Sequence, residues 1–205
     1  MSTQGTAFIG KERNYMALTD YQKYTIEDIY NLPEDVRVEL IDGKIYNMTA
    51  PRRIHQEILI SICTTIYNHI HEKHGECKVY PAPFAVRLIK DEQTLVEPDI
   101  SVICDKDKLD DKGCNGAPDW IIEVISPSSR NMDYFVKMFK YREAGVREYW
   151  IVDPEKNRIL VYAFEKEDIR EYSFNDRVTS EIFSDLFIDF SEFISVEEDS
   201  HFYKW

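Results

Sequence analysis

Two short apolar runs, each with a carboxylate inside it, limit this chain more than any other feature of its sequence. The run 96–100 carries Asp99 beside Val and Ile residues, and the run 120–125 carries Glu123 in the same kind of setting. Runs of this length and composition are typical of strands that are buried on both faces. A carboxylate there is costly unless it is paired, protonated or bound to a cation. On neighbouring strands, Asp99 and Glu123 would supply the minimum pair of oxygen ligands that a hard divalent cation needs.

The rest of the chain predicts a mixed α/β domain with a central sheet. The strongest local signal is the Asp42-Gly43 pair between two alternating runs, which predicts a tight hairpin. Ile at every fourth position predicts an amphipathic helix over 54–70, with His55 in its first turn. The other predicted elements, in chain order, are a helix over 25–32, a broken strand over 78–88, a strand over 96–103, a charged surface loop over 105–116, a strand over 120–125, a helix over about 130–144, strands over 146–152 and 158–164, and one or two short strands with a further helix near 189–194.

The predicted helix over 130–144 has two different stripes of side chains. The stripe expected to pack against the sheet is apolar and consists of Met132, Phe135, Val136 and Phe139. Asp133, Lys137 and Tyr141, spaced by four, form the other stripe. As an exposed pair at i, i+4, Asp133 and Lys137 would contribute only ~0.2–0.5 kcal/mol to stability.

Length and composition indicate one soluble globular domain. The chain has 205 residues, of which 43% are hydrophobic and 31% charged, enough for a substantial core. We expect residues 1–20 to form a loosely held extension and residues 21–200 to form a single domain with an acidic part over 163–200. The sequence shows no membrane-spanning run and no secretory h-region. Its four cysteines lack a C-x-x-C pair, which argues against a zinc knuckle. We expect a cytoplasmic location, in which these cysteines would be reduced thiols.

The net charge of −13 counts against nucleic acid as a partner, because phosphate binding needs local positive potential. The distribution of charge weakens this objection. Residues 163–199 hold 12 acids and 3 bases, whereas residues 120–147 hold 5 bases and 3 acids. Most of the excess negative charge therefore lies in the C-terminal part, and a basic face near the centre is compatible with the sequence.

The sequence around Glu123 resembles one known family. It has PDWIIEVISPS at 118–128 and GVREYWIVDP at 145–154, with Asp133, Lys137 and Tyr141 between them; upstream it has ELIDG at 39–43, HQ at 55–56 and Pro98-Asp99. In this order the residues resemble the Uma2 family of endonucleases, in the PD-(D/E)XK nuclease superfamily. The resemblance covers about residues 24–162.

The resemblance implies a fold and an activity. The fold would be a restriction-endonuclease-like core, α/β or mixed α+β in class, whose central mixed sheet is flanked by helices, with an N-terminal hairpin and extra C-terminal strands. The activity would be hydrolysis of phosphodiester bonds in nucleic acid, with DNA as the expected substrate and Mg²⁺ or Mn²⁺ as the ion. Related nucleases often work as dimers, so a homodimer is also an expectation.

The resemblance also implies a set of site residues: Asp99, Glu123, Lys137, Glu39 and His55. Asp99, Glu123 and Glu39 would provide oxygen ligands for the metal, and His55 would orient a water or contact a phosphate. Taken alone, these residues have plainer interpretations. Asp99 would be a turn carboxylate after Pro98, Glu39 a solvated residue of a hairpin, and His55 an ordinary surface group.

The position of the lysine departs from the superfamily pattern. There a lysine follows the glutamate by two positions on the same strand, but Ile125 stands at that position here. The Uma2 pattern has a lysine in the following helix, where this chain has Lys137, with Lys140 as the alternative. A long lysine stem that leans toward the helix N-terminus could reach back to the end of the Glu123 strand.

Two other classes of function are compatible with the sequence. One is a catalytically silent module that keeps the fold and binds nucleic acid or a partner. The other is a dimerisation or regulatory protein whose aromatic side chains line an interface. Binding of a divalent cation that depends on Asp99 and Glu123 would separate the nuclease from both.

Overall fold

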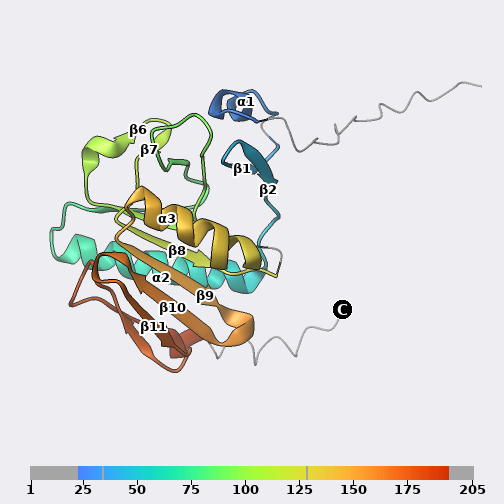
Figure 1. The fold of residues 1–205 in the computed structure, drawn as a ribbon. Helices are drawn as coiled ribbons and strands as arrows, with labels where there is room; N and C mark the ends of the chain where they lie inside the picture. The colour runs from blue at the N-terminus through green and yellow to red at the C-terminus, as the bar shows by residue number, and fades with distance from the viewer. Residues whose placement is uncertain (1–22, 34, 128, 194–205) are drawn as a thin grey trace, which may run out of the picture.

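A six-stranded mixed sheet forms the centre of the molecule (Figure 1). The structure is a computed structural model that describes residues 23–33, 35–127 and 129–193, so the predicted extension 1–20 and the end of the predicted domain, 194–200, lie outside the described residues. The strand order is β11-β10-β9-β8-β5-β3, in which β8 and β9 run parallel and the other neighbours antiparallel. The strands are β3 (Lys78–Pro81), β5 (Ile100–Ile103), β8 (Trp120–Val124), β9 (Glu148–Asp153), β10 (Arg158–Ala163) and β11 (Asp168–Tyr172).

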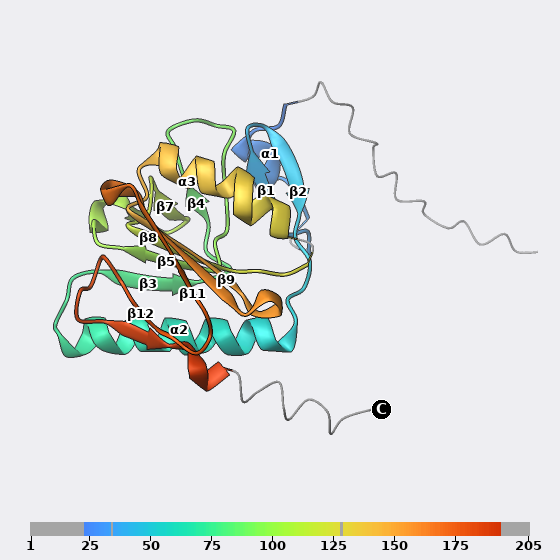
Figure 2. The same cartoon turned by 60° about the horizontal axis from the view of Figure 1, so that its bottom comes forward.

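Helices cover both faces of this sheet (Figure 2). Helix α2 (Arg53–Glu72) lies on one face, and a π-helix (Met132–Lys137) continued by α3 (Met138–Ala144) lies on the other. The alternation along the buried strand β8 explains the two layers, because its side chains point to opposite faces in turn. Trp120 and Ile122 join the core cluster that contains the buried face of α2, whereas Ile121 joins the cluster beneath α3. The predicted mixed α/β class with a central mixed sheet is thus confirmed.

The N-terminal hairpin also follows the prediction. Strands β1 (Val38–Ile41) and β2 (Lys44–Asn47) pair across a turn in which Asp42 and Gly43 have φ of 53° and 77°. Positive φ at both central residues is what a type I′ hairpin requires. A short helix, α1 (Ile26–Tyr30), precedes the hairpin and begins with a capping box between Thr25 and Asp28. All four residues of β1 are buried, so its side chains contact protein on both faces.

Smaller elements surround this core. A second sheet is formed by β4 (Val86–Arg87), β7 (Gly113–Asn115) and β6 (Leu109–Asp110); β12 (Arg177–Thr179) pairs with β13 (Phe187–Asp189); and 3₁₀ turns occupy Lys106–Lys108, Pro154–Lys156, Phe164–Lys166 and Phe190–Phe193. The prediction of a surface loop over 105–116 was therefore wrong in part, because this segment contains the β6–β7 hairpin. Gly113, at φ +139°, lies close to the backbone of Ala85. A Cβ at this position would lie 2.1 Å from the carbonyl oxygen of Ala85, so only glycine fits here.

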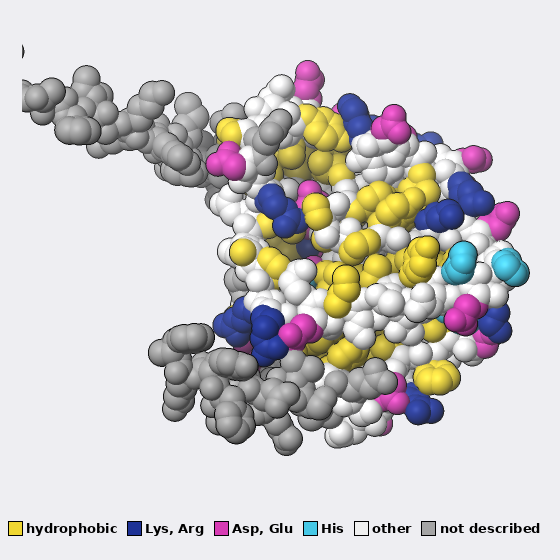
Figure 3. Space-filling view, turned by 180° about the vertical axis from the view of Figure 1, so that it is seen from behind, with side chains coloured by type: hydrophobic (Ala, Val, Ile, Leu, Met, Phe, Trp, Pro, Cys, Tyr) yellow, Lys and Arg dark blue, Asp and Glu magenta, His cyan; other side chains and the backbone are white. Residues whose placement is uncertain are grey.

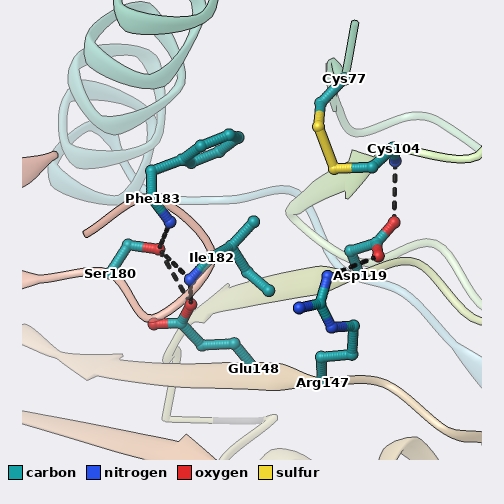
Figure 4. Close-up of a disulfide and its surroundings, with 8 residues drawn as sticks. All are labelled: Cys77, Cys104, Asp119, Arg147, Glu148, Ser180, Ile182 and Phe183. Atoms are coloured by element: carbon teal, nitrogen blue, oxygen red, sulfur yellow. Dashed lines mark hydrogen bonds and ion pairs between the residues drawn. A yellow bond between two sulfur atoms is a disulfide. The ribbon is translucent and has the colours of Figure 1, made fainter. Parts of the chain in front are cut away.

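A buried glutamate anchors the C-terminal strands to the sheet (Figure 4). Glu148 of β9 accepts hydrogen bonds from Ser180 Oγ (2.9 Å), the Ile182 N–H (3.0 Å) and Trp150 Nε1 (2.6 Å). Burial raises the pKa of Glu148, and these hydrogen bonds oppose that rise by favouring the charged form. The described part of the acidic C-terminal segment, residues 163–193, is therefore packed onto the same core as the rest, with β11 as an edge strand of the central sheet.

The prediction of four reduced cysteines was wrong for one pair. Cys77 and Cys104 form a disulfide that joins the start of β3 to the end of β5 (Figure 4). The antiparallel register explains it: Lys78 lies opposite Ile103, so the next position along places the two cysteines opposite each other. Register depends on tertiary structure, which the spacing of cysteines along the chain does not reveal. Cys63 and Cys114 are free. No helix of the described ranges is long and apolar enough to span a bilayer.

Candidate active site

A cavity of about 470 Å³ lies where the hairpin, the start of α2, the ends of β5 and β8, and the π-helix meet. The residues that line it come from four separate stretches of the sequence, so the site exists only in the folded chain. All five residues predicted for the site line this cavity: Glu39, His55, Asp99, Glu123 and Lys137. Asp133 lines it as well. Lys140 instead contacts Asp42, with 2.8 Å between Lys140 Nζ and Asp42 Oδ1, so of these two lysines Lys137 is the one that lines the cavity.

Asp99 and Glu123 form a cross-strand pair at one end of β5 and β8. These strands are antiparallel neighbours with Ile100 opposite Ile122, so the same register places Asp99 opposite Glu123. The Asp99 N–H donates to Glu123 Oε2 at 3.2 Å, and the Val124 N–H donates to Asp99 Oδ2 at 2.8 Å. Each carboxylate is thus held by the backbone of the other strand. The prediction that the two strands are neighbours is confirmed, but the predicted strand over 96–103 is shorter than expected: β5 begins at Ile100, and Asp99 directly precedes it.

Lys137 connects three carboxylates from three different elements. Its Nζ lies 2.9 Å from Glu39 Oε1, 3.0 Å from Glu123 Oε1 and 3.5 Å from Asp133 Oδ1. Tyr141 donates its hydroxyl to the same Glu123 Oε1 at 2.8 Å. The side chain of Lys137 is only 6% exposed. The interpretation of Asp133 and Lys137 as a weak surface pair was therefore wrong.

The helix turns the opposite face to the sheet from the one predicted. Phe135, Val136 and Phe139 are 61%, 37% and 56% exposed, whereas Asp133, Lys137 and Tyr141 are buried. The physical reason is Glu123, because a buried carboxylate on β8 requires polar partners from the layer above it. An apolar stripe in that position would leave Glu123 unpaired.

The π-helix aligns these three polar side chains. Four residues make slightly more than one turn of an α-helix, at 3.6 residues per turn. In a π-helix, with its i→i+5 hydrogen bonds, four residues make slightly less than one turn. The step from Asp133 to Lys137 lies within the π-helix, and the step from Lys137 to Tyr141 lies largely within α3. The two angular drifts have opposite signs, so all three side chains can face Glu123.

The cluster has more negative than positive groups, and the pKa values reflect this. Burial raises the pKa of Glu123 well above its ordinary value; Lys137 opposes the rise, and Asp133 and Asp99 add to it. Burial alone would lower the pKa of Lys137, but its carboxylate neighbours outweigh that effect and hold the pKa well above the ordinary range. One ammonium group cannot neutralise so many carboxylates. Lys137 therefore keeps its proton, while the excess of negative charge raises the affinity of the acids for a further proton.

His55 and Glu39 are buried rather than solvated. His55 is 9% and Glu39 5% exposed. His55 Nε2 lies 3.0 Å from Asp99 Oδ2, while Glu39 Oε1 accepts the Glu97 N–H at 2.9 Å in addition to its contact with Lys137. Within the described ranges, the buried Nδ1 of His55 has no hydrogen-bond partner. The interpretations of both residues as surface groups were therefore wrong. The start of α2 brings His55 to Asp99, and β1 brings Glu39 to Lys137.

Two groups of the cluster were not among the predicted site residues. Asp133 and Tyr141 contact Lys137 and Glu123 directly. The signal that could have identified them was the spacing of four on either side of Lys137, since residues at that spacing share one helix face. A polar residue at each of the three positions indicates that the whole stripe faces a polar partner.

Ionisation of Asp133 should make stability depend on pH. Burial raises its pKa from 3.8 to about 6, although Lys137 acts in the opposite direction. A raised carboxyl pKa gives stability that is complete below about pH 4 and is lost as the pH rises through 6. Asp133→Asn should remove this loss, so its stability relative to wild type should rise by roughly 2–3 kcal/mol between pH 4 and pH 7. Urea unfolding at both pH values measures this difference, and a constant difference would contradict the assignment.

The donor chemistry of the cluster fits a hard divalent cation. Asp99, Glu123 and Glu39 offer carboxylate oxygens, which Mg²⁺ and Mn²⁺ prefer. Among the described residues, the side-chain hydrogen bonds of Asp99 are made through Oδ2, which leaves Oδ1 available to a ligand within that part of the chain. Among the residues that the structure describes, no three His, Cys, Asp or Glu side chains surround one cation position. Instead, the ammonium group of Lys137 lies between Glu39 and Glu123.

The fold, a central mixed sheet with helices on both faces, is that of the restriction-endonuclease-like class of proteins. The sequence model of the Uma2 family, described as "Putative restriction endonuclease", matches residues 20–196. The chain therefore belongs to the Uma2 family. This match confirms the resemblance found in the sequence and extends it beyond residue 162.

Two individual proteins are similar to the chain. "Uncharacterized protein slr1290" of Synechocystis sp. (strain ATCC 27184 / PCC 6803 / Kazusa) is 27% identical over 125 residues, which cover 60% of this chain and 64% of that protein. The chain thus matches less than two thirds of that relative's length. A crystal structure described as a putative nuclease belonging to DUF820, from Anabaena variabilis ATCC 29413, matches with a TM-score of 0.68 at 20% identity. That match covers 83% of this chain and 97% of the other, and at this identity it supports the fold.

Proposed function

We propose that this protein hydrolyses phosphodiester bonds in nucleic acid, with DNA as the first substrate to test, and that the reaction requires Mg²⁺ or Mn²⁺. The observation that carries the proposal is the imbalance of charge beside the cavity. Glu39, Glu123 and Asp133 share one buried ammonium group, that of Lys137, and Asp99 lies directly beside Glu123. A buried group with this excess of negative charge is stabilised by a cation. Membership of a family described as restriction endonucleases favours a catalytic use for it.

Asp99 and Glu123 would hold the metal, with Glu39 as a third oxygen donor. When bound, the ion would polarise the phosphodiester and lower the pKa of a water molecule. The chain's own contacts keep the acids in place for this role. His55 and the Val124 N–H fix Asp99 through Oδ2, while Tyr141 fixes Glu123 through Oε1. Such second contacts orient ligands and limit their motion.

Lys137 would stabilise the negative charge that develops on the phosphate. Its pKa is held well above the ordinary range, so it carries a proton at neutral pH and acts as a fixed positive charge. A general base would need a lower pKa, near the working pH. The lysine reaches the site from the helix that follows β8, which explains how the chain tolerates Ile125 at the usual position of the lysine.

Calorimetric titration with Mn²⁺ tests the metal site separately from catalysis. We expect a saturable heat in wild type and at least a tenfold weaker affinity in Asp99→Asn, because one carboxylate charge and its oxygen are lost. Asp107→Asn is a matched control on an exposed acid outside the cavity and should bind like wild type. Equal affinity in Asp99→Asn would show that the cation binds elsewhere. Absence of any binding to wild type would favour the catalytically silent alternative.

A further inference from the structure

The cavity has an apolar and aromatic lining in addition to its charges. Tyr46 of β2, Met48 and Met132 all line it and are all half-buried. Aromatic rings are the surfaces on which nucleobases stack in proteins that bind single strands. Thioether side chains make favourable contacts with aromatic rings as well. The cavity thus combines a charged part suited to a phosphate with an apolar part suited to a base.

Arginine side chains lie at the same cavity and come from two elements. Arg37 precedes β1 and Arg52 precedes α2, and their side chains are 43% and 67% exposed. Arg37 pairs with Glu97 at 2.7 Å, and Arg52 pairs with Glu155 at 3.1 Å. Such exposed pairs contribute little to stability, so both guanidinium groups could exchange their partners for phosphates, which they bind in bidentate fashion.

On the face seen from behind Figure 1, positive charge is not gathered into a broad surface (Figure 3). On the face seen from behind, Lys and Arg side chains lie beside Asp and Glu side chains, with hydrophobic side chains across the middle (Figure 3). A duplex bound mainly through its backbone would call for a wide basic surface. The predicted basic face is therefore not what this side of the molecule presents. Individual arginines at the cavity are a better match for the backbone of one strand.

The depth and size of the site also favour a single strand. Glu123 and Glu39 are only 4% and 5% exposed, so a reacting phosphate must enter the cavity to reach them. A volume of about 470 Å³ is that of a small-ligand site. A base that is paired and stacked in a duplex cannot contact Tyr46 within such a cavity. It can do so only when it is unpaired or turned out of the helix.

We propose that the site takes an unpaired polynucleotide strand, one nucleotide at a time, with the base against Tyr46 and the flanking phosphates on Arg37 and Arg52. This proposal rests on the proposed function, since it assigns the scissile phosphate to the Asp99–Glu123 pair. It names the class of substrate: single strands, flaps and frayed ends, in preference to intact duplex. Tyr46 is a positioning residue and not a catalytic one.

Binding to the Glu123→Gln protein in Mn²⁺ tests the proposal without cleavage. The probes are a fluorescent single-stranded oligonucleotide, made as DNA and as RNA, and the DNA duplex of the same sequence. We expect the single strand to bind at least tenfold more tightly than the duplex. Tyr46→Ala should weaken single-strand binding by roughly tenfold, within the range measured for loss of one stacking contact. Tyr46→Phe should bind like the parent, and Tyr46→Leu, which keeps the apolar volume, should bind like Tyr46→Ala.

The arginines have a separate readout in the salt dependence of binding. Each phosphate contact contributes about 0.7 to the slope of log affinity against log salt for single strands. Arg37→Ala and Arg52→Ala should each lower the slope by about this amount. Arg53→Ala is the matched control, because Arg53 is an exposed arginine (61%) that pairs with Glu57 and does not line the cavity. A slope reduced as much by Arg53→Ala would overturn the role given to Arg37 and Arg52.

Cleavage by wild type separates failure of this proposal from failure of the proposed function. If wild type cleaves duplex as well as single strands and Tyr46→Ala changes neither binding nor cleavage, the preference for unpaired strands is wrong and the nuclease function stands. If wild type cleaves nothing but binds single strands in a Tyr46-dependent way, the hydrolytic function is wrong and the binding mode stands. If no nucleic acid binds, both are wrong.

Discussion

Replacing Lys137 by Met should lower the free energy of unfolding by about 3–5 kcal/mol, the usual cost of removing one partner from a buried ionic group. The lysine supplies the positive charge that contacts Glu39, Glu123 and Asp133. Without it, Glu39, Glu123 and Asp133 would repel one another in a buried space. The methionine fills a similar volume, so the loss would reflect charge and not a cavity. Urea unfolding at pH 7 measures it.

Lys140→Met is the control for this substitution. Lys140 is on the same helix, is 22% exposed and pairs with Asp42, so its replacement should cost less than about 1 kcal/mol. Similar losses in the two variants would show that the cluster does not depend on Lys137. Unfolding at acid pH is a second check. Protonation of the carboxylates removes their repulsion, so it should restore much of the stability that Lys137→Met loses. A loss caused by a packing defect would not be restored.

Glu123→Gln should reduce the rate of cleavage by a factor of roughly 10³ or more while leaving the protein at least as stable as wild type. The loss of rate is expected because the variant lacks one of the two carboxylates proposed to hold the metal, and contributions of several kcal/mol are usual for such groups. The stability is expected because burial already raises the pKa of Glu123 well above its ordinary value. Ionising it in the folded state is therefore costly, and a neutral amide of the same shape avoids that cost.

The opposite signs of the two effects separate a catalytic role from a structural one. A residue needed only for folding would lose activity and stability together. Single-turnover cleavage and urea unfolding at pH 7 give the two numbers for the same preparation. A Glu123→Gln protein that is both less stable and still active would contradict the role assigned to Glu123.

The acid-bearing strands could be predicted because their constraint is local. An apolar run that contains a carboxylate limits its own structure: Glu123 lies within β8, and Asp99, which directly precedes β5, meets it because β5 and β8 are neighbours. The Asp42-Gly43 hairpin is similarly local, since its two residues alone require positive φ. In both cases the sequence contains the cause of the structure.

The helix after β8 was predicted at the right place but with the wrong face inward. Periodicity compares residues within one helix and favours the apolar stripe of Phe135 and Phe139 as the buried one. The buried face of the helix is determined instead by Glu123 of β8, because its buried carboxylate requires Lys137 and Tyr141 as partners. Knowledge of the polar partner, rather than a better measure of periodicity, would have corrected the prediction.

The burial of His55 and the Cys77–Cys104 disulfide depend on long-range geometry. His55 is buried because the start of α2 approaches Asp99, 44 residues further along the chain. The disulfide depends on the register of β3 against β5. Neither relation has a local signature. The role of His55 came from family resemblance, and the disulfide was missed.

The most direct test of the central claim is cleavage of single-stranded and plasmid DNA by the purified wild-type protein, in Mn²⁺ and in EDTA. The account predicts products in Mn²⁺ and none in EDTA, with cleavage lost in Glu123→Gln at unchanged fold. Cleavage that persists in EDTA, or that Glu123→Gln carries out at the rate of wild type, would contradict it.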